Sequence, residues 1–265
     1  MLYEQIPDPR PWHPLENADD GFRARFVTVP AIVDDWISGY RSLEGADILD
    51  FGCGEGVSAL ALALNYRPRS VVGVDIMPDP ERCQPVARAN LGIEALPANL
   101  RLHRVTPGFL HDPQERFDVA YSWSVFEHVD ERLFDGVLRL IRAALRPAGL
   151  FLAQIAPLFY SSEGSHLTHR IREPWCHLLT QHSVFYERLC AAVPDPAERD
   201  ALWSTYRTLN RITARELVER IARSGFEVLR TYFSKDAAAP PQRLRAIYRD
   251  EVLSTNQVVV LARPR

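Results

Sequence analysis

Residues 48–58 read Ile-Leu-Asp-Phe-Gly-Cys-Gly-Glu-Gly-Val-Ser, and residues 71–76 read Val-Val-Gly-Val-Asp-Ile. The first stretch is an apolar run that ends in three closely spaced glycines and is followed by a helical pattern, which predicts a strand that turns directly into a helix. Because glycine has no Cβ atom, such a turn lets backbone amides approach a ligand closely. Asp75 ends the next predicted strand, where a carboxylate can accept hydrogen bonds from ribose hydroxyls. The two stretches therefore predict a ribose-containing ligand at the edge of a sheet.

The spacing of the glycines separates two classes of ligand. A dinucleotide fingerprint, GxGxxG, needs its third glycine where this chain has Val57, whereas Gly56 comes one residue earlier. This spacing disfavours a pyrophosphate, although Asp75 suits both classes. The structural alternative is a strand-to-helix turn that holds no ligand. Cys53, inside the turn, is interpreted as a small packing residue rather than a nucleophile.

Short apolar runs alternate with helical patterns on both sides of this motif. Near-continuous apolar strands between helices predict a parallel sheet that is covered on both faces. The expected strands are 46–51, 70–76, 100–105, 117–123, 150–155, 226–233 and 257–262, and the expected helices are 22–40 with Pro30 as a possible break, 58–66, 82–90, 133–145 and a helix that starts after Thr213. Thr213 and Glu216 form a predicted capping box, and Gly225 is the expected residue after that helix.

The alternation predicts four segments along the chain. They are an N-terminal arm and helix (1–42), a ligand-binding core (43–156), a helical cap (157–212) with two histidine-containing helical segments, and a C-terminal return to the sheet (213–265) with a short insertion at 236–253.

The composition limits the classes of function. With 265 residues, of which 46% are hydrophobic and 25% charged, the chain can bury a large α/β core, which excludes disorder. A net charge of −3 gives no general reason to bind nucleic acid or an anionic membrane. No apolar run approaches the ~20 residues of a membrane span, and the first residues lack a basic start and an apolar segment. We expect a cytoplasmic monomer or homodimer that acts on a small molecule.

The residues Asp50-Phe-Gly-Cys-Gly-Glu-Gly56 stand as the motif (D/E)xGxGxG, and the chain here resembles the class I S-adenosylmethionine-dependent methyltransferases. The resemblance continues through Asp75, residues 117–129 and residues 145–150, and covers about residues 43–156. It implies a seven-stranded Rossmann-like α/β sheet with helices on both faces, a helical cap insertion and S-adenosylmethionine as cofactor. It further implies a set of cofactor contacts: Asp50, Gly52, Gly54 and Gly56 at the methionyl part, Asp75 at the ribose, and Ile76, Thr106, Ser122 and Trp123 around them. The family usually has an acidic residue after the third strand, where this chain has Val105-Thr-Pro-Gly108.

The segment after the fourth predicted strand bears on the acceptor. Relatives that methylate DNA or RNA carry (D/N/S)PP(Y/F) or Pro-Cys there, whereas this chain reads Ser122-Trp-Ser-Val-Phe-Glu-His128. Nucleic acid is therefore disfavoured, and the resemblance implies methyl transfer to an oxygen or nitrogen of a small biosynthetic molecule. A sugar or surface-glycan acceptor, or a cofactor-binding enzyme with a non-methylating reaction, remains the alternative.

The cap holds half of the eight histidines, namely His166, His169, His177 and His182. A histidine can act as general base near neutral pH, and we predict His166, beside Gly164-Ser165, as the catalytic base, with His177 second. The alternatives are hydrogen bonds within the cap, or a metal held by His166, His169 and Glu163; we predict no metal. Phe126, Tyr160 and Glu163 are the predicted acceptor contacts, although Trp123 and Phe126 can equally be core residues and the other two solvated loop residues.

Overall fold

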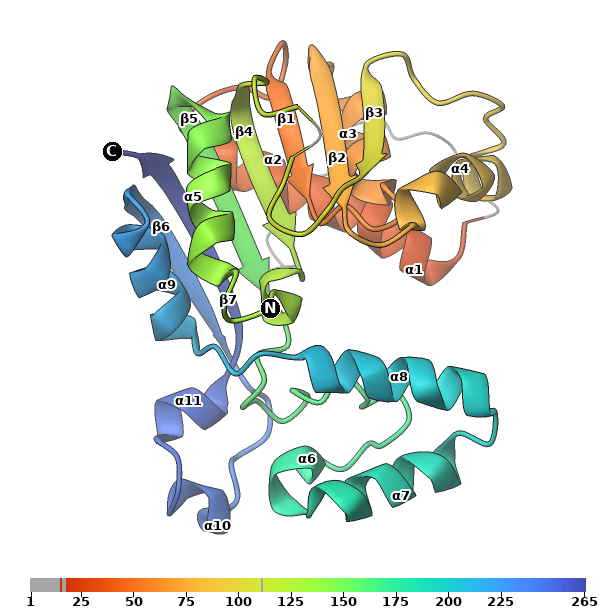
Figure 1. The fold of residues 1–265 in the computed structure, drawn as a ribbon, viewed down its shortest axis with the longest axis vertical. Coiled ribbons are helices and arrows are strands. Elements are labelled where there is room, and N and C mark those ends of the chain that lie inside the picture. The colour runs from red at the N-terminus through yellow and green to blue at the C-terminus, as the bar shows by residue number, and fades with distance from the viewer. Residues whose placement is uncertain (1–14, 16–17, 111) are drawn as a thin grey trace.

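The structure is a computed structural model that describes residues 15, 18–110 and 112–265, so most of the predicted N-terminal arm lies outside the described residues. Seven strands form one sheet in the order β3-β2-β1-β4-β5-β7-β6 (Figure 1). The strands are β1 (Asp47–Phe51), β2 (Ser70–Asp75), β3 (Leu100–Arg104), β4 (Phe117–Trp123), β5 (Leu145–Ile155), β6 (Phe226–Lys235) and β7 (Thr255–Pro264). This seven-stranded Rossmann-like arrangement confirms the predicted fold class.

One strand runs against the prediction of a parallel sheet. β7 pairs antiparallel with both β5 and β6, whereas β1 to β5 pair in parallel. A parallel pair needs a crossover that covers one face of the sheet. The segment between β6 and β7 makes no such crossover, because it contains only the short helices α10 (Gln242–Arg245) and α11 (Asp250–Ser254). The Asp236 amide, just after β6, donates to the Ser254 carbonyl, just before β7, at 2.6 Å. The chain therefore re-enters the sheet beside the end of β6, and β7 runs antiparallel to it.

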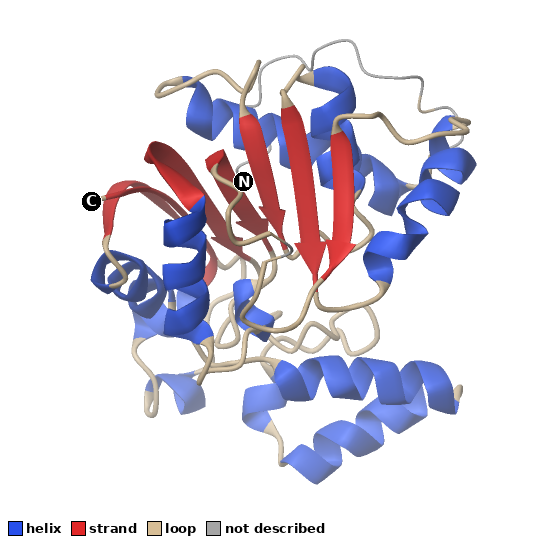
Figure 2. Cartoon of the chain, turned by 45° about the horizontal axis from the view of Figure 1, so that its top comes forward, coloured by secondary structure: helices blue, strands red, loops and turns tan. Residues whose placement is uncertain are grey.

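Helices cover both faces of the sheet, as Figure 2 shows. The alternation of side chains along each strand divides the core into two clusters. Ile48, Tyr121 and Leu261 face α2 (Val29–Ser38), α3 (Val57–Asn65) and α4 (Cys83–Leu91). Their neighbours Leu49, Ala120 and Val260 face α5 (Phe134–Ala144) and α9 (Ala214–Arg223).

The first helical run contains a wide turn. α1 (Asp20–Arg23) continues through a π-helical segment, η2 (Ala24–Thr28), into α2. Pro30 lies at the start of α2, where its missing N–H and its ring would disturb regular α-helical bonding. The π-helical turn supplies the local adjustment, and the helix continues through Pro30 rather than breaking there.

The cap between β5 and α9 has a small core of its own. It contains three helices, α6 (Cys176–Leu179), α7 (His182–Ala192) and α8 (Pro196–Thr208), of which only the first two contain histidine. Phe185, Leu189 and Tyr206 pack together in a cluster separate from the two faces of the sheet. The cap lies beyond the arrowheads of the parallel strands (Figures 1 and 2), which is the edge where open α/β sheets bind ligands.

The helix after the cap follows the local signals of the sequence closely. The Thr213 hydroxyl accepts the Glu216 amide and the Glu216 carboxylate accepts the Thr213 amide, which confirms the capping box. Gly225, at φ +89°, follows the last helical turn, as predicted. Two short 3-10 turns, η3 (Asp79–Arg82) and η4 (Phe126–His128), complete the elements. Among the residues described, no helix is both long and apolar enough to cross a membrane.

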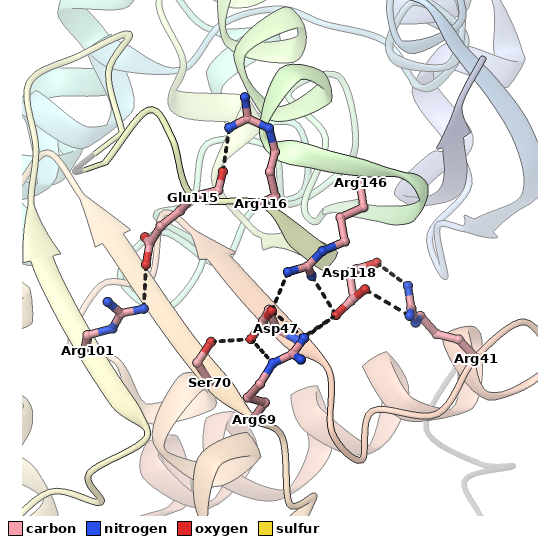
Figure 3. Close-up of polar contacts among 9 residues, drawn as sticks. All are labelled: Arg41, Asp47, Arg69, Ser70, Arg101, Glu115, Arg116, Asp118 and Arg146. Atoms are coloured by element: carbon pink, nitrogen blue, oxygen red, sulfur yellow. Dashed lines mark hydrogen bonds and ion pairs between the residues drawn. The ribbon is translucent and has the colours of Figure 1, made fainter.

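A cluster of charged side chains joins the starts of four strands, at the edge opposite the cap (Figure 3). Arg69 donates to both carboxylate oxygens of Asp47, at 2.9 and 2.6 Å, and Arg146 contacts Asp47 and Asp118 at 2.7 and 2.8 Å. Arg41 adds an ion pair to Asp118 at 3.0 Å. Burial alone would raise the pKa of Asp47, but Arg69, Arg146 and the Ser70 hydroxyl lower it to about 2. The cluster therefore joins the amino edge of the sheet through ion pairs to Asp47 and Asp118.

Candidate active site

The three glycines of the β1–α3 turn all adopt left-handed backbone conformations. Their φ angles are +80° at Gly52, +53° at Gly54 and +73° at Gly56. The amides of Gly52 and Cys53 donate to the Val74 carbonyl at 2.8 and 3.1 Å, which fixes the turn to the end of β2. Residues with side chains rarely adopt this conformation, so the glycines are required by the backbone alone.

A side chain at each glycine would meet a different environment. A Cβ at Gly52 would lie 2.3 Å from a Val125 methyl, and one at Gly56 would lie 2.6 Å from a Leu102 methyl. A Cβ at Gly54 would meet nothing within 4 Å. Gly52 and Gly56 therefore allow close packing inside the protein, whereas Gly54 borders open space in which a ligand can reach the backbone.

Asp75 is held against the same turn. One of its carboxylate oxygens accepts the Gly54 amide at 2.8 Å and the other accepts the Met77 amide at 2.8 Å. Each oxygen keeps capacity for a further hydrogen bond, so the carboxylate can still accept ribose hydroxyls.

Exposed side chains follow the ends of β2 and β3. Ile76 and Met77 are about half exposed at 50% and 55%, and Phe109 is 65% exposed. Thr106, which precedes Phe109, is also exposed. Apolar side chains in such positions can cover the faces of a flat ring, and the cofactor contacts predicted for Ile76 and Thr106 remain open to a ligand.

Asp50 lies beneath the turn rather than in front of it. The residue is buried, and the Tyr121 hydroxyl donates to its carboxylate at 2.6 Å. Burial, with a smaller contribution from the negative charge of Asp75, raises the pKa of Asp50 to about 7, against the lowering effect of Tyr121. The carboxyl group joins β1 to β4 through Tyr121, and a direct contact between Asp50 and the ligand remains a prediction.

Two of the contacts predicted near the end of β4 are buried in the structure. Phe126 is fully buried and packs against Phe51, Phe134 and Phe151, with ring centroids 5.2–6.2 Å apart, because the η4 turn places it over the sheet core. It is a core residue and not an acceptor contact. Ser122 is likewise buried within β4, and its hydroxyl has no hydrogen-bond partner among the described residues, so its contact with the cofactor stays a prediction. Trp123, the last residue of β4, is half-buried and keeps an exposed part.

His166 lies at the junction between the cap and the sheet. Its backbone has a left-handed φ of +60°, and its Nε2 donates to the Pro157 carbonyl at 3.0 Å. That hydrogen bond leaves Nδ1 as the unprotonated nitrogen. The ring stands edge-on to His128, with centroids 5.4 Å apart. Burial lowers the pKa of His166, so the imidazole is neutral near pH 7 and can accept a proton.

His177 occupies a different environment from His166. It is buried in the cap core, its Nε2 donates to the Phe159 carbonyl at 2.7 Å, and its ring contacts Phe159 and Phe185. Burial lowers its pKa to about 4. These contacts favour the alternative that His177 packs and forms a hydrogen bond within the cap, and its role as a second catalytic base stays a prediction.

The remaining acceptor candidates, Tyr160 and Glu163, have different surroundings. Tyr160 lines a pocket of about 630 Å³ that is bordered by α9, β6 and α11. Glu163 is exposed, and its carboxylate accepts a hydrogen bond from Asn256 at 3.5 Å. Within the described parts of the chain, no group of three or more His, Cys, Asp or Glu side chains is arranged to hold a metal ion.

Sequence reasoning did not single out Glu127 or Asn210 as site residues, and it gave His128 a packing or loop-orienting role at least as readily as a catalytic one. His128 contacts His166, and Glu127 is buried beside it. Asn210 returns from the cap and binds this turn: its amide donates to the Glu127 carbonyl at 2.8 Å, and its side chain donates to the carbonyls of Phe126 and Val129 at 2.6 and 2.9 Å. The adjacent Glu and His after β4 were the only available signal, and Asn210 had none.

Comparisons with known proteins agree with this geometry. The profile of a family described as "Methyltransferase domain" matches residues 29–231. Cyclopropane-fatty-acyl-phospholipid synthase of Escherichia coli (strain K12) is 30% identical over 49% of this chain and 30% of its own length. Ubiquinone biosynthesis O-methyltransferase of Methylobacterium nodulans is 32% identical over 42% of this chain and 41% of its own length. The chain thus matches less than half of either protein.

Among solved structures, an S-adenosylmethionine dependent methyltransferase from Mesorhizobium loti has the same fold, with a TM-score of 0.52 and 18% identity. The superposition covers 86% of this chain and 96% of the other.

Proposed function

The chain belongs to the class I S-adenosylmethionine-dependent methyltransferase family, and from this premise we propose that the whole protein transfers a methyl group from S-adenosylmethionine to an oxygen or nitrogen atom of a small molecule. The observation that carries the proposal is the open backbone at Gly54, whose amide is joined to Asp75. The Asp75 carboxylate can accept the hydroxyls of a ribose, and the open backbone at Gly54 can border the chain attached to that ribose. This arrangement fits S-adenosylmethionine.

The cofactor would be held by the glycine turn, the Asp75 carboxylate and the exposed side chains after β2 and β3. When bound, it supplies an electrophilic methyl group on a sulfonium. The chain's own task is then to align the acceptor with that methyl group and, for a protonated acceptor, to remove the proton.

His166 is the residue that we assign to the proton. Its neutral imidazole keeps Nδ1 free, and its ring lies where the cap meets the turn after β4. His128 supports the ring from the opposite element, and burial together with the nearby His166 lowers the pKa of His128 to about 4. Both rings are therefore neutral at pH 7, which leaves His166 able to accept a proton from a hydroxyl or an amine.

A small acceptor is favoured by the cap and by the charge of the chain. The cap lies beyond the carboxyl edge of the sheet, and the net charge of −3 gives no general reason to bind a polyanion. One relative is named as an O-methyltransferase of ubiquinone biosynthesis, which is compatible with an oxygen acceptor.

The proposal is tested in two steps. Calorimetry should first detect binding of S-adenosylmethionine and S-adenosylhomocysteine, and no binding would refute the assignment of the glycine turn. Incubation with radiolabelled S-adenosylmethionine and fractions of small-molecule extracts should then give labelled product and S-adenosylhomocysteine in equal amounts. Cofactor binding with a product that carries no label would point to a non-methylating reaction.

A further inference from the structure

Glu127 is a buried carboxyl group that the proposed reaction does not use. The residue is 2% exposed, and neither of its carboxyl oxygens forms a hydrogen bond with another described residue. Burial raises its pKa to about 8, opposed only by a contact with its own backbone amide. An ionised carboxylate without a partner is strongly disfavoured inside a protein, so the free protein holds Glu127 as the neutral acid at pH 7.

Several polar groups on the surrounding elements are already engaged, whereas the buried Ser122 hydroxyl of β4, like Glu127, has no hydrogen-bond partner among the described residues. Along β5, residues 150–155 include one polar side chain, Gln154, whose oxygen accepts the amide and the hydroxyl of Ser124 at 3.0 Å each. Asn210 is occupied by backbone carbonyls of the turn. The titratable rings of His128 and His166 are neutral and offer no positive charge. No group of the described chain forms a hydrogen bond with the carboxyl oxygens of Glu127.

The position of Glu127 connects the two halves of the proposed site. The turn that carries it begins at Val125, which lies directly against Gly52 of the glycine turn. The same turn is bound by Asn210 at the end of the cap. A ligand that extends from the glycine turn towards the cap passes this turn, so the missing partner of Glu127 can come from such a ligand.

We propose that Glu127 binds, as a carboxylate, the amino group of a bound ligand, which is either the methionyl ammonium of the cofactor or an amine of the acceptor. The inference rests on the proposed function. An ammonium supplies a positive charge and up to three donors, enough for both carboxyl oxygens, whereas a hydroxyl supplies one donor. When the ligand binds, Glu127 releases its proton to solvent, and the resulting carboxylate forms an ion pair with the ligand ammonium.

Carbon-13 NMR of protein labelled at the glutamate carboxyl groups tests the inference, with the Glu127 resonance assigned by its loss in Glu127→Gln. The pKa of Glu127 is measured in the free protein, with S-adenosylhomocysteine, with 5′-methylthioadenosine, which lacks the amino-acid part, and with ethylamine added to the S-adenosylhomocysteine complex. A lower pKa of Glu127 in the complex with S-adenosylhomocysteine alone identifies the cofactor as the source of the amino group. A decrease only after ethylamine is added identifies an amine acceptor. An unchanged pKa in every complex, or an ordinary value near 4 in the free protein, overturns the inference.

Affinity gives an independent measurement. Each unit by which the ligand lowers the pKa corresponds to about tenfold tighter binding to the ionised form. If the cofactor is the source, Glu127→Gln should weaken S-adenosylhomocysteine about 10- to 100-fold and leave 5′-methylthioadenosine unchanged. If the acceptor is the source, only ethylamine binding should weaken. Glu187→Gln, an exposed position on α7, is the matched control and should change neither. A wild-type protein that fails to bind S-adenosylhomocysteine refutes the proposed function. If S-adenosylhomocysteine binds but the pKa of Glu127 stays unchanged in every complex, including the one with ethylamine, this inference alone is refuted.

Discussion

Replacing Gly54 by alanine separates ligand contact from backbone strain. Gly54 and Gly92 both have left-handed backbones, with φ angles of +53° and +69°, and a Cβ at either position would meet nothing within 4 Å. Gly92 caps the C-terminus of α4, whereas Gly54 is joined to Asp75 in the glycine turn. The two alanine variants therefore impose the same conformational strain, and only one places a methyl group where the cofactor is expected.

The magnitudes follow from this comparison. Holding alanine in a left-handed conformation costs about 1–2 kcal/mol, so both variants should lose that much unfolding free energy, and Tm should fall by about 2–4 °C per kcal/mol for a chain of this size. Only Gly54→Ala should lose affinity for S-adenosylhomocysteine, by at least about tenfold, because a steric penalty of about 1.4 kcal/mol already gives that factor. Gly52→Ala should be less stable than either, since its methyl group would overlap Val125.

Thermal unfolding and calorimetric titration of the three variants give the test. The reasoning is refuted if folded Gly54→Ala binds S-adenosylhomocysteine as tightly as the wild type. It is also refuted if Gly92→Ala loses the same affinity, because the effect would then come from general destabilisation.

Three further predictions concern the carboxylate, the histidines and the amino edge. Asp75→Ala should weaken S-adenosylmethionine at least about tenfold in calorimetry, because charge-assisted hydrogen bonds contribute about 1.5–3 kcal/mol each; an unchanged Kd would argue against ribose recognition. His166→Ala should lower kcat about 10²- to 10⁴-fold and abolish the decrease in rate that the wild type shows when the pH falls below the lowered pKa of His166. His177→Ala should mainly reduce Tm. The opposite result would identify His177 as the catalytic base. Because the folded pKa of Asp47 is about 2, below its ordinary 3.8, its ion pairs stabilise the fold above about pH 4 and lose this effect as pH falls towards 2. Denaturant titrations should therefore show a lower unfolding free energy for Asp47→Asn than for the wild type at pH 7. The difference should shrink as the pH falls towards 2, and a difference that does not change with pH would contradict this assignment.

The sequence by itself determined the elements whose signals are local. The glycine turn follows from backbone conformations that only glycine adopts readily, and the α9 helix follows from a capping box and a terminal glycine. β4 occupies residues 117–123, as predicted, because an apolar run between turn signals specifies a buried strand without reference to its neighbours.

Only the tertiary structure decided what depends on neighbours distant in sequence. The direction of β7 depends on how the segment after β6 returns to the sheet, and the burial of Phe126 depends on three phenylalanines from other elements. His177 lies in a core made by the whole cap, and the contact between His128 and His166 joins residues from separate segments. A residue type and its spacing specify the chemistry that a side chain can perform, but burial and the available partners, which set its pKa and accessibility, arise only when the chain is folded.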